Sequence, residues 1–189
     1  MGTLKYIRHT DGGMDYMRNA VNYVSNGHDK KYPVYSPNVN LSDAFNQFYM
    51  VRQYFGKISG NPVFHFIVSF STRSTWGDNY HRALDFSRWL ADYFAGRYQV
   101  IYSVHKKYRY NKQGNCVSIY HAHILINSVS YIDGKMFAGN KSDIYSFLEY
   151  IKKILKSPNS FKNNVKNLKL INIRITSLIF LDIPLILPY

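Results

Sequence analysis

Residues 117–127 read VSIYHAHILIN, and this stretch decides the fold class. Successive residues of a β-strand point to opposite faces, so His121 and His123 share one side of a strand here. The other side carries Ala122, Ile124 and Ile126. The apolar side predicts packing into a core, and the two imidazoles converge on a point that suits a metal ion. We therefore predict that this strand is central in a sheet, with helices packed against its apolar face.

Two further segments have strand character. Residues 63–71, VFHFIVSFS, place His65 and Ser69 on one face and the phenylalanines on the other, which we expect to pack on helices. Residues 98–105 read as a neighbouring strand that could pair antiparallel with 117–127 through a long connection. Together these segments predict an α/β (α+β) fold, an antiparallel sheet with helices packed on its faces.

Amphipathic helices are predicted wherever apolar residues recur in steps of three and four. These segments are residues 14–25, 42–55, 79–95 and 142–155, with Ser42 as the expected N-cap of the second. Residues 30–37, which contain two prolines, predict a loop. Beyond Lys156 the composition changes to Lys and Asn, and then to Ile and Leu interrupted by charges and prolines. We predict one domain over 1–157 and a C-terminal tail, 158–189, that is an added strand, a disordered end or the product of a truncation, and no membrane span.

Charge indicates the kind of partner. Lys and Arg total 24 against 11 Asp and Glu, a formal net charge of +13 that is spread along the chain. Such an excess favours a polyanion, and the aromatic content of 17% favours a folded core. Cys116 is the single cysteine, which excludes an intramolecular disulfide and a multi-cysteine metal site. With no signal peptide at the N-terminus, we expect a cytoplasmic protein.

A third histidine is needed to complete a metal site with open positions for substrate oxygens. His105 is the candidate, because it ends the strand that neighbours 117–127. His65 is the reserve, since it lies on the polar face of its own strand with Ser69.

The segment HAHILINSV (121–129), followed by DGKMF (133–137), resembles the third motif of the MobA/MobL-type plasmid mobilisation relaxases of the HUH endonuclease superfamily. Three upstream segments resemble the other motifs of this family in its order. They are MRNAVNYVSNGHDKK (17–31), HFIVSFS (65–71) and RYQVIYSVH (97–105). The resemblance covers roughly residues 3–155. The chain departs from the family in the 15 residues between His105 and His121, and in having Lys106 and Lys107 where an acidic residue is usual.

The resemblance implies metal-dependent nicking and strand transfer on single-stranded DNA at a plasmid transfer origin, through a covalent phosphotyrosine. It implies Mn or Mg as the cofactor and accessory mobilisation proteins as further partners. The nucleophile it selects is Tyr23, with Tyr16, seven residues earlier on the same helix face, as the fallback. Supporting roles fall to Asn127, which would orient a metal histidine or the backbone, and to Ser69, which would bind a phosphate. The expected DNA-binding residues are Lys30, Lys31, Lys106, Lys107 and Arg109.

Two other functions remain open from the sequence. A rolling-circle replication initiator uses the same histidines, with a tyrosine that follows them in the chain, and residues 142–154 offer Tyr145 and Tyr150. A catalytically inactive DNA-binding remnant would bind single strands without a metal.

Overall fold

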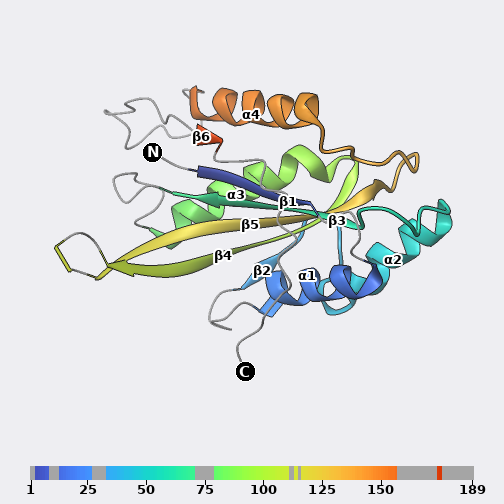
Figure 1. Cartoon of the computed structure of the whole chain (residues 1–189), viewed down its shortest axis with the longest axis horizontal. Coiled ribbons are helices and arrows are strands. Elements are labelled where there is room, and N and C mark those ends of the chain that lie inside the picture. Colours follow the sequence, from blue (N-terminus) through green and yellow to red (C-terminus); the bar gives the residue numbers. More distant parts are fainter. Residues whose placement is uncertain are drawn as a thin grey trace.

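The computed structural model describes residues 3–8, 13–26, 33–70, 79–110, 113–114, 116–156 and 174–175 (Figure 1). A six-stranded sheet with the order β2-β4-β5-β3-β1-β6 forms its centre. Its strands are β1 (Thr3–Arg8), β2 (Val34–Tyr35), β3 (Val63–Ser69), β4 (Tyr98–Tyr110), β5 (Cys116–Ser130) and β6 (Arg174–Ile175). Every neighbouring pair is antiparallel except β1 and β6, which run parallel. The predicted antiparallel sheet with the His-x-His pair on a central strand is confirmed.

Helices cover both faces of the sheet. They are α1 (Met14–Asn26), α2 (Ala44–Tyr54), which follows the 3-10 turn η1 (Leu41–Asp43), α3 (Tyr80–Ala95) and α4 (Lys141–Lys156). In Figure 1, α3 and α4 lie on one side of the sheet, and α1 and α2 lie below it on the other side. The sheet therefore separates two hydrophobic cores. Residues that point to one face of the sheet pack with α3 and α4, and residues that point to the other face pack with α1 and α2.

The phenylalanine face of β3 packs on helices, as expected. Phe66 is fully buried, and its ring centroid lies 5.1 Å from that of Phe94 on α3 and 5.3 Å from that of Phe147 on α4. Ile124 and Ile126 of β5 belong to the same core and are fully buried. Burial of large apolar side chains on this face fixes the register of the strands, since a one-residue slip would bring the histidines into the core.

The structure differs from the sequence prediction at several boundaries. β1 and β2 were not predicted, because both are short and become strands by pairing with β3 and β4. The pairing of β4 with β5 continues to Tyr110 opposite Cys116, so the connection expected to be long is a short one. Ser42 is not an N-cap. The Asn40 side chain accepts a hydrogen bond from the Ser42 backbone N–H at the start of η1, and α2 begins only at Ala44.

Within the described residues, no helix is long and apolar enough to cross a membrane. The predicted tail, 158–189, lies outside the described residues except for the backbone of 174–175, so the domain boundary at residue 157 stays a prediction.

Gly139 is a site where a small substitution should have a large effect. It has φ +59°, and a Cβ atom added there would lie 2.8 Å from Cζ of the buried Phe64 ring, with Cε1 closer still. We expect Gly139→Ala to lower the free energy of unfolding by about 2–4 kcal/mol, because backbone strain and overpacking add. Gly56→Ala is the matched control, since Gly56 has φ +62° with nothing within 4 Å of the added carbon. Urea denaturation should show a smaller loss for Gly56→Ala, and equal losses would contradict the packing argument.

Candidate metal centre

Strand register brings the histidines together on the α1 side of the sheet. His105 of β4 pairs directly with His121 of β5, and His123 lies two residues further along β5 on the same face. Each of these three residues offers one ring nitrogen, and the three nitrogens lie within 4.8 Å of one another. The ring centroids of His105 and His123 are 4.3 Å apart. Three imidazoles at these separations form a set that a transition-metal ion could bind.

His123 provides the test of whether a metal fits. The residue is 1% exposed, and its Nε2 atom is buried with no hydrogen-bond partner in the part of the chain that the structure describes. A buried polar atom without a partner is costly, and a bound cation would satisfy it. Burial, followed by the nearby His65, His105 and His121, holds the pKa of His123 well below its usual value. The imidazole is therefore neutral at neutral pH, which is the form that binds metals.

His65 supports His123. Its Nε2 atom lies 2.8 Å from Nδ1 of His123, and both side chains are buried. A hydrogen bond to Nδ1 leaves Nε2 of His123 for the metal and fixes the orientation of the ring. His65, the reserve ligand, thus contacts His123 and does not belong to the group of three histidines whose nitrogens lie within 4.8 Å of one another.

Ser103 has a similar supporting contact that the sequence analysis missed. Its hydroxyl oxygen lies 3.0 Å from Nε2 of His105, and the residue is fully buried beside His123 in the register of β4 and β5. The signal was present in the sequence, because a residue two positions before a histidine on a strand shares its face.

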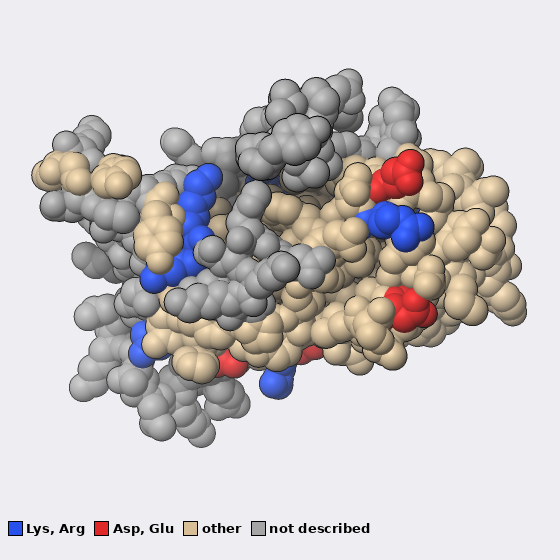
Figure 2. All heavy atoms as spheres, turned by 90° about the horizontal axis from the view of Figure 1, so that it is seen from below, with Lys and Arg blue, Asp and Glu red and all other residues tan. Residues whose placement is uncertain are grey.

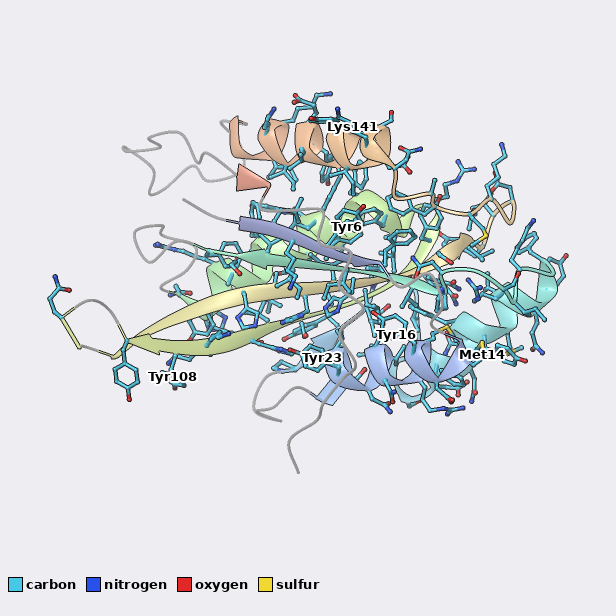
Figure 3. The ribbon with its side chains drawn as sticks, in the orientation of Figure 1. Tyr6, Met14, Tyr16, Tyr23, Tyr108 and Lys141 are labelled. Carbon is cyan, nitrogen blue, oxygen red and sulfur yellow. The ribbon has the colours of Figure 1, made fainter. Side chains whose placement is uncertain are left out.

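Tyr23 reaches the histidines from α1. Its ring centroid lies 5.4 Å from that of His123, 5.8 Å from that of His105 and 6.0 Å from that of His65. Figure 3 shows Tyr23 between α1 and the sheet, with Tyr16 further back along the same helix. The helix is held there by Met17, Val21 and Val24, which pack against the sheet in the smaller core. Burial raises the pKa of both tyrosines, and more so that of Tyr16.

Other candidates lie around this centre. Ser69 pairs with His121 across β3 and β5, so it lies beside the metal candidates, and its contact with a phosphate stays a prediction. Lys5, which sequence analysis did not select, is half-buried on β1 and pairs with Ile67, which in turn pairs with His123. The same face therefore carries a cation two strands from the histidines.

Asn127 is fully buried and holds the backbone. Its Nδ2 donates hydrogen bonds to the Phe48 carbonyl oxygen (3.0 Å) and to Oε1 of Gln99 (2.9 Å), and its Oδ1 accepts one from the Val129 backbone N–H (3.2 Å). Of the two roles expected for Asn127, these contacts correspond to the backbone role. Because Phe48 belongs to α2, and α2 packs beside α1, Asn127 helps to fix the layer that carries Tyr23.

Three of the expected DNA-binding cations, Lys106, Lys107 and Arg109, belong to β4. Lys106 is half-buried and Lys107 is exposed, both on β4 just beyond His105. Lys30 and Lys31 lie outside the described residues, as does the side chain of Arg109.

Tyr145 and Tyr150 lie on α4, across the sheet from the histidines. Tyr150 donates a hydrogen bond to the Trp89 carbonyl oxygen of α3 (3.0 Å), and Tyr145 is 51% exposed. The core residues of α4 pack with Ile124 and Ala122, on the face opposite to His121 and His123. The sheet therefore separates both tyrosines from the metal candidates.

Comparison with known families agrees with this geometry. Residues 7–159 match the family described as Relaxase: MobA/VirD2-like, nuclease domain. The chain belongs to this relaxase family. The match spans α1, the histidine strands and α4, so the relaxase nuclease domain contains the three histidines and Tyr23, whereas Lys5 lies just before its first residue. No curated protein and no solved structure gave a significant match. Membership identifies the chain as a DNA-nicking relaxase, a DNA-binding endonuclease, and its histidine cluster agrees with the family's use of a divalent metal.

Proposed function

We propose that this relaxase domain nicks single-stranded DNA at a plasmid transfer origin and becomes covalently joined to it through Tyr23, in conjugative mobilisation. The observation that carries the proposal is the position of the Tyr23 ring, within 6.0 Å of the rings of His65, His105 and His123. We assign His105, His121 and His123 as the ligands, with His65 and Ser103 as positioning residues.

A divalent metal, Mn or Mg from the family, would supply the positive charge that stabilises the scissile phosphate. Three neutral imidazoles would leave that charge undiminished. Lys5 and Ser69, on the same face, are the residues we propose to hold the phosphate oxygens, with Lys107 further along β4.

Tyr23 would perform the bond exchange. A bond forms between its hydroxyl oxygen and phosphorus while the bond from phosphorus to the leaving deoxyribose oxygen breaks. The phenol gives up its proton during the attack, since burial raises its pKa, and the leaving oxygen takes one up. Because one phosphodiester replaces another, the step is reversible and the DNA end is kept for rejoining.

The replication-initiator alternative requires a tyrosine from α4 at the metal. The position of α4 on the opposite face of the sheet argues against it. The inactive-remnant alternative requires a damaged centre, whereas the three histidines of this chain lie within ligand distance of one another.

A denaturing gel for a covalent protein–DNA adduct tests the proposal. The full chain would be incubated with Mn and single-stranded oligonucleotides from the DNA flanking the gene. We expect an adduct with the wild type, with Tyr145→Phe and with Tyr150→Phe, and none after chelation. Loss of the adduct in either α4 variant would favour the replication initiator. Tight binding of DNA without any wild-type adduct would favour the inactive remnant.

A further inference from the structure

The ends of β4 and β5 form a two-stranded ribbon that projects from the sheet. In the part of the chain that the structure describes, β3 pairs with β5 as far as His121, and β2 pairs with β4 as far as Ser103. Beyond these points β4 and β5 continue to pair with each other, from Lys106 opposite Tyr120 to Tyr110 opposite Cys116. Figure 1 shows the two strands extending together past the helices.

One face of the ribbon is lined with tyrosines. Lys106, Tyr108 and Tyr110 are every second residue of β4 and therefore share one face of the ribbon. Tyr102 and Val104 lie on the same face closer to the body, where they are buried in the core under α3 and α4. Tyr108 is 59% exposed and Tyr110 is 78% exposed, whereas tyrosines in small domains usually pack their rings inward. Figure 3 places Tyr108 toward the projecting end, far from Tyr23.

A lysine lies among these rings. The Lys106 ammonium lies 5.1 Å from the ring centroid of Tyr108 and 5.7 Å from that of Tyr120. Tyr120 in turn contacts Tyr80 at the start of α3, with centroids 5.9 Å apart. Tyr80, Tyr120 and Tyr108 thus follow one another from the body outward, with the Lys106 ammonium near the last two rings. Aromatic rings with a cation beside them are the combination that binds unpaired bases and the backbone that links them.

The charge of the ribbon favours a polyanionic partner. From residue 98 to residue 132 the sequence has three Lys, one Arg and neither Asp nor Glu. In Figure 2, Lys and Arg side chains gather at the end of the molecule that carries the ribbon, and the larger acidic areas on this view lie toward the other end. Most protein surfaces mix charges of both signs, whereas a surface that carries basic residues alone attracts a polyanion.

The spacing of the tyrosines favours single strands. Residues two apart on a strand are about 6.8 Å apart, twice the rise of about 3.4 Å between stacked bases of one DNA strand. Tyr108 and Tyr110 cannot therefore each take a base from an undisturbed duplex stack, but each can stack on a base that has been splayed out.

We infer that the tyrosine face of the β4–β5 ribbon is a binding surface for unpaired nucleotides, separate from the metal centre and on the opposite face of the sheet. Tyr108 and Tyr110 stack on the bases, and Lys106 attracts the phosphates that link them. The inference rests on the proposed action on single-stranded DNA. It adds a second contact that holds the strand while Tyr23 reacts.

The test measures binding without chemistry. Affinity of the full chain for a fluorescent oligo-dT would be measured by anisotropy in a chelator, for wild type and Tyr108→Ala/Tyr110→Ala. We expect the double variant to bind at least about tenfold more weakly, because stacking on each base is worth roughly fivefold or more. Tyr54→Ala is the matched control, since Tyr54 is 83% exposed on α2, away from the ribbon. It should bind as the wild type does.

Two further measurements identify the cause. The slope of log affinity against log salt should be unchanged in the double tyrosine variant and reduced by about 0.7 in Lys106→Gln, which removes one phosphate contact. A duplex of the same length should lose little affinity in the tyrosine variant. An unchanged affinity for oligo-dT, an equal loss in Tyr54→Ala or an equal loss for duplex would overturn the inference. The adduct gel measures the covalent reaction and the anisotropy experiment measures binding without it, so the two proposals can be tested separately.

Discussion

Tyr23→Phe should abolish the covalent adduct and lower the rate of nicking by at least about a thousandfold. The substitution removes a single oxygen, the atom that would form the bond to phosphorus, and keeps the ring that packs 5.4 Å from His123. Losses of this size are typical when the nucleophile of a covalent mechanism is removed and no other group replaces it. Nicking of a labelled oligonucleotide in Mn, measured in single turnover, gives the rate.

Tyr16→Phe is the control for the Tyr23 variant. Tyr16 lies on the same helix and is half-buried, so it reports any general effect of losing a tyrosine hydroxyl from α1. We expect less than about a fivefold change in its nicking rate, and binding of the oligonucleotide within about threefold of wild type for both variants. If Tyr16→Phe loses the adduct and Tyr23→Phe keeps it, the nucleophile is Tyr16 and the assignment is wrong.

The second large effect is expected at the histidines. His123→Ala removes the buried nitrogen that has no partner among the described residues, and should weaken binding of Mn by more than about a hundredfold. His65→Ala should weaken it by roughly tenfold to a hundredfold, because the ring of His123 would keep its ligand nitrogen but lose the hydrogen bond that orients it. Titration calorimetry with the full chain measures both affinities.

His81→Ala is the control for the metal prediction. His81 is exposed at the start of α3, on the side of the sheet away from the metal centre, and should bind Mn as the wild type does. Circular dichroism would verify that each variant is folded. A loss in His65→Ala as complete as in His123→Ala would make His65 a direct ligand, and an unchanged affinity in His123→Ala would remove the metal centre from the proposal.

The sequence predicts the face of each strand well and the pairing between strands poorly. The alternation of polar and apolar residues was enough to place His121 and His123 on the face opposite to Ala122, because the face that is buried selects apolar residues. It could not show that His105 pairs with His121, since register is fixed by contacts between distant segments. The support of His123 by His65 depends on the same register. His65 pairs with Leu125, so its ring reaches His123 diagonally.

The position of α1 could not be derived from its own residues. The apolar stripe of Met17, Val21 and Val24 predicts that the helix packs on something, but not on which face of the sheet. Only the family resemblance put Tyr23 near the histidines. β1 was missed for a related reason, because six residues become a strand only through the neighbour they pair with.

Because β4 and β5 pair without a break, the ribbon can differ in length while the histidines keep their positions. His105 and His121 are fixed from the body of the sheet, by β3 and the packed helices, and the ribbon begins only at the next pair, Lys106 and Tyr120. Residues added or removed in matched numbers beyond this pair change the reach of the ribbon and leave the histidines where they are. The 15 residues between His105 and His121 then form an interval of adjustable length. On the proposed function, a relaxase that exchanged one ribbon for another would contact different DNA and keep the same metal centre.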